Sequence, residues 1–504
     1  MEKAEPPTPF HRPSTAARQG PPACDSAVQR GLSTLQATVV AVAVMVFGTI
    51  AGLRPEVIVP ALEVGAAAAF LFVACWRILL TLLSLRVASP TPTLPAARLP
   101  RYTVVAALHD EAEVVGQLIA RLGRIDYPPD QLQGFLVLEA HDLETIAQAR
   151  HAPRPPWLDI LIAPAGLPQT KPRALNVALG HATGELLTVY DAEDDPDPGQ
   201  LREAAARFAA DRGGRLACLQ APLRIRRRFQ CPEPSPFLDR QFALEYASLF
   251  ETVLPGLARL GLPFPLGGTS NHFRVDVLRA LGGWDAWNVT EDADLGFRLW
   301  RDGWRLGVLA RPTWETPPGG LNAWLPQRAR WLKGYMQTFG VHTRKPWRLG
   351  FRGAFALVMT VGAGLASAAL HGPSLAWFAA ALLVTGVAGL PPATSPMALG
   401  VLFFGAVSAW VSCGVGARRA GIRFSVADMI AAPAYWSLLS LAFVHAAWRL
   451  AREPFVWDKT RHRRDAPDIG SAGITPLRAY HAALDEDALP GLSAPHAAAP
   501  EHVA

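Results

Sequence analysis

Two long runs without a charged side chain constrain this chain most. Leu32 to Leu53 and Gly353 to Ala417 contain no Asp, Glu, Lys or Arg, and the second run is 65 residues long. One bilayer crossing needs roughly 20 apolar residues, so the second run has room for more than one. With 50% hydrophobic and only 18% charged residues, the whole composition favours a chain that lies partly in lipid.

A second apolar stretch near the N-terminus, Val57 to Leu85, is interrupted by Glu63 and Arg77. These two residues are about 21 Å apart along a helix at 1.5 Å per residue. Their side chains can therefore reach opposite membrane interfaces. Together with the first run, this stretch predicts a helical hairpin that returns the chain to the cytosol.

Apolar segments also follow Arg352, and they predict four further crossings. Four crossings return Arg449 to Arg464 to the cytosol, but they place Arg418 and Arg419 outside, against the positive-inside bias. The alternative is that one segment is re-entrant or lies in the membrane interface. The four segments are 353–370, 374–390, 397–417 and 429–448.

Charge and cysteine usage exclude other classes. The net charge of +6 comes largely from basic residues beside the apolar runs, and no basic helix or aromatic-interleaved basic strand is present. Nucleic-acid binding is therefore excluded as an interpretation. The five cysteines have no spacing typical of a zinc site or a disulfide framework, which fits a reducing compartment.

The middle of the chain alternates short β-like runs with helical patterns, which predicts a mostly parallel sheet covered by helices. Such sheets bind ligands at the carboxyl ends of their strands. The expected strands are Tyr102–Leu108, Phe135–Glu139, Leu158–Ala163, Leu186–Tyr190 and Leu216–Leu219, and the expected helices are Glu111–Gly123, Pro172–Ala182, Pro198–Ala210 and Leu321–Phe339.

An acidic cluster follows the predicted strand Leu186–Tyr190. Asp191 and Glu193 to Asp195 have no basic residue nearby in sequence until Arg202, so an external cation is the expected compensation. Oxygen ligands suit Mg²⁺ or Mn²⁺. In an extended segment Asp191 and Glu193 face the same way and Asp194 turns aside, so Asp194 is the reserve ligand. The alternative is a solvated acidic turn.

Three other segments carry candidate chemistry. Thr290 to Asp294 can cap a helix, but three acids exceed what a helix end requires, and one could serve as a general base. Gln327, Arg330 and Trp331 share one helix face that suits a diphosphate beside a sugar, although interfacial anchoring would explain the Arg and Trp equally. Lys171 lies at a predicted helix N-terminus, where anions bind; it is one of only five lysines.

In this order the motifs resemble the inverting family 2 glycosyltransferases, in the membrane-integrated branch that includes cellulose and hyaluronan synthases. The resemblance covers roughly Tyr102 to Trp331 and the flanking helices. Asp126-Tyr127-Pro128, Asp191-Ala192-Glu193-Asp194 and the segment Pro454 to Thr460 look closer to the phage-adsorption protein B type subgroup. The resemblance implies an α/β GT-A (nucleotide-diphospho-sugar transferase) domain inserted between transmembrane helices.

The resemblance also implies roles for individual residues. It implies that Asp292 is the catalytic base. It also implies that Asp191 and Glu193 bind the divalent metal on the donor diphosphate, with Asp194 as the alternative to Glu193. Two departures from the family pattern stand out, namely Asp110 where Asn is usual and Asp-Ala-Glu-Asp where Asp-x-Asp is usual. The residues expected to bind donor or acceptor are Asp110, Glu111, Glu139, Asp142, Lys171, Gln327, Arg330 and Trp331.

The expected function is sugar transfer from a nucleotide-diphosphate sugar, with a UDP-sugar as the expected donor, to a growing polysaccharide or another glycan or lipid-linked acceptor. The expected location is a bacterial-type inner membrane, with several passes, membrane-lipid contact and a cytosolic catalytic domain. Alternatives are single-sugar transfer to a polyprenyl phosphate and a receptor or secretion partner with little turnover. The expected parts are a disordered tail (1–31), two transmembrane helices (32–86), the GT-A domain (87–350), about four transmembrane helices (351–449) and a mostly disordered cytosolic tail (450–504).

Overall fold

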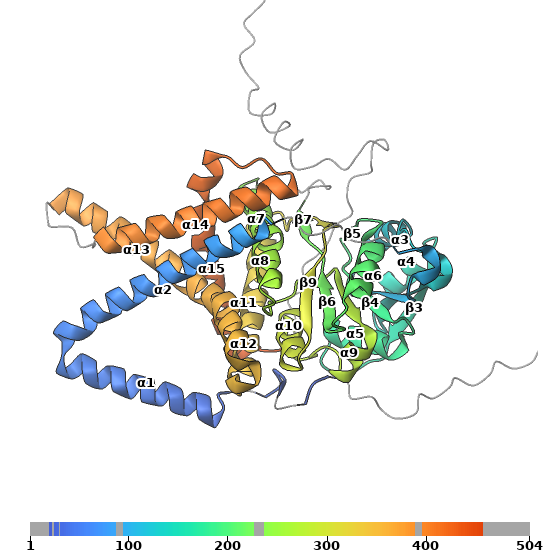
Figure 1. The fold of residues 1–504 in the computed structure, drawn as a ribbon, viewed down its shortest axis with the longest axis horizontal. Helices are drawn as coiled ribbons and strands as arrows, with labels where there is room; N and C mark the ends of the chain where they lie inside the picture. Colours follow the sequence, from blue (N-terminus) through green and yellow to red (C-terminus); the bar gives the residue numbers. More distant parts are fainter. Residues whose placement is uncertain are drawn as a thin grey trace, which may run out of the picture.

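The computed structural model describes residues 20–22, 25–29, 31–86, 94–225, 236–388 and 396–456. An α/β domain forms one side of the molecule, and long apolar helices project from its other side (Figure 1). This arrangement confirms the expected α/β domain between flanking apolar helices. The expected tail after residue 456, including Arg461 to Arg464, lies outside the described residues.

The central sheet has seven strands in the order β3-β2-β1-β4-β8-β6-β9. The strands β3, β2, β1 and β4 are parallel, whereas β8 is antiparallel to both β4 and β6. The sheet is therefore mostly parallel, as predicted. Its strands are β1 (Tyr102–Leu108), β2 (Leu132–Glu139), β3 (Leu158–Ala163), β4 (Leu186–Tyr190), β6 (Leu216–Gln220), β8 (Asn271–Arg274) and β9 (Arg305–Val308).

A second, three-stranded sheet has the order β5-β10-β7, and helices cover the larger sheet on both faces (Figure 1). The small strands are β5 (Asp195–Pro196), β7 (Leu223–Ile225) and β10 (Thr313–Glu315). The helices of the domain are α3 (Val115–Leu122), α4 (Leu143–His151), α5 (Lys171–His181), α6 (Gln200–Ala210), α7 (Pro236–Ser248), α8 (Leu254–Arg259), α9 (Val275–Ala280), α10 (Glu291–Arg301) and α11 (Leu321–Thr343).

Five helical segments of the described chain are long and apolar enough to cross a membrane. They expose many large apolar side chains, as lipid-facing helices do. The helices that form them are α1 (Thr34–Leu53), α2 (Pro55–Ser84), α12 (Gly350–Leu357) continued through a π-helical turn by α13 (Ala363–Ala388), α14 (Pro396–Ala420) and α15 (Val426–Arg452).

The described chain therefore has three long apolar segments after the α/β domain, where the sequence predicted four. The predicted break at His371-Gly372-Pro373 does not occur, because Pro373 lies inside α13. The Gly372 N–H donates instead to the Ser440 hydroxyl of α15 at 2.9 Å. A neighbouring helix thus binds the backbone directly beside the proline, and α13 continues through it.

Both ends of α15 contact the α/β domain. Near its start, Asp428 pairs with Arg240 of α7 at 2.7 Å. Just after its end, the carbonyl of Glu453 accepts a hydrogen bond from Lys333 of α11 at 3.2 Å. Helix α15 therefore begins and ends beside the domain, which agrees with the alternative that one apolar run lies along the interface.

The hairpin of α13 and α14 brings its basic end back to the same domain. Arg419, in the last turn of α14, donates to the carbonyls of Ser84 and Glu251, each at 2.9 Å. Arg418 and Arg419 thus lie on the side of the α/β domain. The four-crossing count had placed them on the opposite side, because it divided α13 into two spans.

Part of the N-terminal segment is ordered, contrary to the expectation of a disordered tail over residues 1–31. Asp25 pairs with Arg301 at 3.1 Å and with Arg348 at 2.7 Å. The Ser26 hydroxyl donates to Asp285 at 2.7 Å. These long-range polar contacts leave no periodic pattern in the sequence, which is why the sequence did not predict them.

Candidate active site

The acidic cluster lies at the carboxyl end of β4, where an α/β sheet binds its ligand. Asp191 and Glu193 line a large cavity that opens there. The Lys171 ammonium, at the first residue of α5, forms an ion pair with Asp191 and donates to the Gly268 carbonyl at 2.7 Å. Burial lowers the pKa of Lys171, but Asp191 and Glu291 outweigh it and raise that pKa overall, so the ammonium stays charged.

Asp194 faces away from the cavity and is fully buried. Its Oδ2 accepts from the Asp191 N–H at 2.7 Å and from the Thr269 hydroxyl. Burial, and then Asp191 and Glu193, raise the pKa of Asp194 well above its usual value. Asp194 therefore fixes the turn after β4, while Asp191 and Glu193 face the cavity.

Basic side chains distant in sequence neutralise part of the acidic cluster. Lys171 pairs with Asp191, and Arg124 pairs with Asp195. Arg121 donates to the backbone carbonyl of Glu193 at 2.9 Å. The sequence predicted an external cation as the compensation for these acids, whereas the fold itself brings two basic side chains to them.

The residues at β4 still fit a divalent ion, because they offer carboxylate oxygens toward a cavity. Among the described residues, the compact group of three possible ligands is His109, Asp110 and Asp142, not the acids after β4. A metal at Asp191 and Glu193 would therefore take its remaining ligands from the donor diphosphate and water, as Mg²⁺ commonly does.

Two of the acids expected near the nucleotide, Asp142 and Glu139, form hydrogen bonds within the protein. Asp142 caps α4 by accepting from the Thr145 N–H at 3.1 Å, and it also accepts from the Asp110 N–H at 2.6 Å. Glu139 is buried and binds Arg173 at 2.7 and 2.9 Å. Glu111 and Glu139 are among the residues that line the cavity, whereas Asp110 and Asp142 are not.

Asp292 lies in the first turn of α10 and also lines the cavity. Its Oδ1 accepts from the Ala293 N–H at 2.7 Å. A Cβ placed on Gly268 would lie 3.3 Å from Asp292 Oδ2 and 3.9 Å from Asp191 Oδ2. The carboxylates of Asp292 and Asp191 therefore both border the space beside Gly268, and glycine leaves that space open.

Burial raises the pKa of two acids in the first turn of α10. It raises the pKa of Asp292, opposed by the Ala293 N–H and by Lys171. It also raises the pKa of Glu291, where the Asp292 charge adds to the effect. A carboxylate whose pKa is raised toward neutrality is a better proton acceptor, which suits Asp292 as a general base.

Helix α11 brings Gln327, Arg330 and Trp331 to the wall of the same cavity. The close approach of α11 to the start of α10 depends on Gly334, because a Cβ at this position would collide with the Thr290 side chain. The structure thus brings together nine of the predicted residues beside one cavity near the strand ends. They are Glu111, Glu139, Lys171, Asp191, Glu193, Asp292, Gln327, Arg330 and Trp331.

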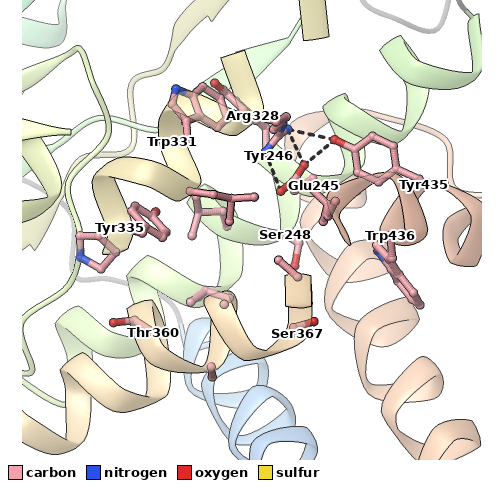
Figure 2. Close-up of a pocket in the computed structure, with 18 of the residues that line it drawn as sticks. Glu245, Tyr246, Ser248, Arg328, Trp331, Tyr335, Thr360, Ser367, Tyr435 and Trp436 are labelled. Carbon is pink, nitrogen blue, oxygen red and sulfur yellow. Dashed lines mark hydrogen bonds and ion pairs between the residues drawn. The ribbon is translucent and has the colours of Figure 1, made fainter. Parts of the chain in front are cut away.

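A polar cluster that the sequence did not predict is formed by Glu245, Arg328 and Tyr435 (Figure 2). Arg328 binds Glu245 at 2.9 and 2.5 Å, and the Tyr435 hydroxyl donates to Glu245 at 2.6 Å. The Arg328 guanidinium also lies 4.5 Å from the Trp331 ring centre. Arg328 falls inside Gln-x-x-Arg-Trp, but only the fold shows that it holds the aromatic side chain in place.

Replacing Glu245 with Gln should destabilise the protein by about 1–3 kcal/mol, because the buried Arg328 cation loses a charged hydrogen-bond partner. A lower thermal unfolding midpoint in detergent would show this. Tyr435→Phe is the matched control, since it removes one hydroxyl and no charge, and it should have a smaller effect. Equal midpoints for Glu245→Gln and the unchanged protein would contradict the structural role of this ion pair.

Comparison with known proteins agrees with this geometry. Residues 186–447, just over half of the chain, match the model of glycosyl transferase family group 2. The chain is 27% identical over 249 residues to the β-monoglucosyldiacylglycerol synthase of Synechocystis sp., covering 48% of this chain and 49% of that protein. It is 28% identical over 256 residues to the cellulose synthase 1 catalytic subunit of Komagataeibacter xylinus, covering 48% and 32%.

A solved structure shares the fold. The mannosyltransferase PcManGT from Pyrobaculum calidifontis, in complex with GDP-Man and Mn²⁺, aligns with a TM-score of 0.51 and 20% identity. The alignment covers 78% of this chain and 99% of that one. The chain spans about half or less of the length of the two curated relatives named above.

The α/β sheet, the acids at its strand ends and the long apolar helices agree with a membrane-associated glycosyltransferase of the GT-A type. The chain belongs to glycosyl transferase family group 2. The expected fold class is thereby confirmed, and the family agrees with the expected enzyme class, a hexosyltransferase-type glycosyltransferase.

Proposed function

We propose that this protein transfers a sugar, with inversion, from a nucleotide-diphosphate sugar to a glycan or lipid-linked acceptor at the membrane. A UDP-sugar is the proposed donor. The observation that carries the proposal is that the Asp292 and Asp191 carboxylates border the same open space beside Gly268 in one cavity. A base for the acceptor and a charged site for the leaving group are thus adjacent.

In the proposed reaction the acceptor oxygen attacks the anomeric carbon while the bond from that carbon to the diphosphate oxygen breaks. Asp292 takes the acceptor proton. Lys171 and Arg330 stabilise the departing nucleoside diphosphate, and Trp331 packs against the acceptor sugar. Asp191 and Glu193 would hold a divalent Mg²⁺ or Mn²⁺, which supplies charge stabilisation to the leaving diphosphate when bound. We place the nucleotide near Glu111 and Glu139, with Asp110 and Asp142 shaping the adjoining loops.

Purified protein incubated with a panel of radiolabelled nucleotide sugars and membrane lipid extract tests this function. Transfer of label from one donor into glycan or lipid, lost in Asp292→Asn, is the expected result. Hydrolysis alone, or no transfer with any donor, would favour the second candidate, a glycosyltransferase-like receptor or secretion partner. The resemblance to the phage-adsorption protein B type subgroup motivates that candidate.

We further propose that residues 87–350 form the cytosolic catalytic domain at a bacterial-type inner membrane. The support is that Arg418, Arg419 and the two ends of α15 all lie on the domain side, where positive charge is retained. The remaining parts are the N-terminal segment (1–31), the hairpin (32–86), the second membrane region (351–449) and the C-terminal segment (450–504).

This topology makes a labelling prediction. In a variant without the native cysteines, Val387→Cys at the end of α13 should react with an impermeant maleimide added outside intact cells. Arg418→Cys should react only after the membrane is opened, because α14 returns to the domain side. Equal labelling at both positions would overturn the hairpin arrangement.

A further inference from the structure

The cavity extends far beyond the transfer site. Its volume is about 1340 Å³, and it continues from Asp191 and Asp292 between α2, α13, α14 and α15. In that second part most lining side chains are apolar or small; examples are Phe70, Ala363, Phe378, Val401 and Leu439. Such a lining suits a hydrocarbon chain better than the hydroxyl groups of a sugar polymer.

Arg77 of α2 lines this cavity. It lies seven residues before the domain-side end of α2 at Ser84, which is about 10 Å along the helix. Within the described residues, no carboxylate forms an ion pair with its guanidinium, and the Cys413 side chain of α14 is its titratable neighbour. Two other cations that line the cavity form ion pairs, Lys171 with Asp191 and Arg328 with Glu245.

A charged side chain inside a membrane helix is costly unless it has a partner, so an unpaired one indicates a ligand. The Arg77 guanidinium can bind an anionic oxygen group, and its planar geometry suits phosphate. Trp410, one helical turn before Cys413, lines the same cavity.

Polar side chains lie along the cavity between Arg77 and the transfer site. Ser248 of α7 bonds to Ser412, the neighbour of Cys413, at 2.8 Å. Ser248 lies one turn after Glu245, which is bound to Arg328, one helical step from Gln327. Figure 2 shows Ser248, Glu245, Arg328 and Trp331 along this wall. Arg77 therefore lies between the apolar part of the cavity and the transfer site.

We propose that the acceptor is a phosphate-containing lipid bound across the whole cavity. Its hydrocarbon tail lies between the membrane helices, its phosphate binds Arg77, and a hydroxyl of its head group reaches Asp292. This inference rests on the proposed transferase function and names the acceptor class of that same site. A polyprenyl diphosphate-linked sugar and a glycerophospholipid share this chemistry.

Lipid binding without any donor tests the proposal separately from catalysis. The purified full chain in detergent is titrated with a farnesyl-diphosphate-linked sugar, dioctanoyl phosphatidylglycerol and neutral dioctanoylglycerol. At least one phosphate lipid should bind tenfold or more tightly than dioctanoylglycerol, and the tighter of the two identifies the source. Arg77→Gln should abolish that preference without weakening dioctanoylglycerol binding, and Arg77→Lys should retain part of it.

The controls separate this proposal from its competitors. Arg418→Gln changes an exposed arginine on a membrane helix and should leave lipid binding unchanged. The titration contains no donor and measures no turnover, so a failed transferase assay would not affect this test. The proposal is overturned if Arg77→Gln, folded by its thermal midpoint, keeps the phosphate preference. Displacement of the lipid by inorganic phosphate alone or by a soluble oligosaccharide would overturn it equally.

Discussion

Asp292→Asn is expected to reduce sugar transfer by about 10²–10⁴-fold, the usual contribution of a positioned general base. Asn keeps the shape of the side chain but cannot accept the acceptor proton. Because Asp292 acts on the acceptor, the affinity for a nucleoside diphosphate should stay within a few-fold of the unchanged protein. Initial rates with the active donor, and calorimetric titration of the nucleoside diphosphate, measure the two quantities.

Asp302→Asn is the matched control, because Asp302 is an exposed acid at the other end of the same helix, α10. It should transfer sugar at the normal rate. Comparable turnover by Asp292→Asn and Asp302→Asn would remove Asp292 from the role of base. A large loss of nucleotide affinity in Asp292→Asn would instead place Asp292 in the donor site.

The second large effect concerns the metal. Donor diphosphate binding should weaken by about 10²-fold in EDTA, since a divalent ion supplies several kcal/mol of charge stabilisation. Asp191→Asn and Glu193→Gln should each abolish most of the difference between Mn²⁺ and EDTA. Titration of the nucleoside diphosphate under both conditions measures this difference directly.

Two variants test whether the effect belongs to the acids that face the cavity. Asp195→Asn should keep the full metal dependence, because Asp195 is paired with Arg124. Lys171→Met should lower affinity with and without Mn²⁺, because Lys171 carries a charge of its own. Equal affinity in EDTA and Mn²⁺ for the unchanged protein would rule out a metal at Asp191 and Glu193.

The sequence predicted the parts of the fold that depend on local pattern. The strands β1, β3 and β4 have the predicted bounds. Strands β1 and β4 are buried and read as mostly apolar runs between turns, whereas β3 is a partly exposed edge strand that is still mostly apolar. The antiparallel strand β8 was not predicted. Its four residues include Asn271 and His272, which are buried although they are polar, so no apolar pattern marks the strand. Length and apolar composition likewise located α1 and α2.

Long-range pairs could not be predicted in the same way. Lys171 and Asp191 are 20 residues apart, and Arg328 and Glu245 are 83 apart, so no local spacing connects them. At Pro373 the local sequence predicted a helix break that does not occur, because contacts with α15 outweigh the local preference. Residues that line the cavity from one helix face, such as Gln327 and Trp331, were the easiest to predict.

The short segment after α15 has a consequence for the order of biosynthesis. The carbonyls of Glu453 and Val456 accept hydrogen bonds from the buried Lys333, and the Phe455 ring lies 5.0 Å from that of Trp287, just before the helix of Asp292. A ribosome synthesises these residues about 100 positions after the catalytic domain ends. The transfer site therefore acquires its final packing only when the last apolar helix has been made, which links catalytic competence to completed membrane assembly.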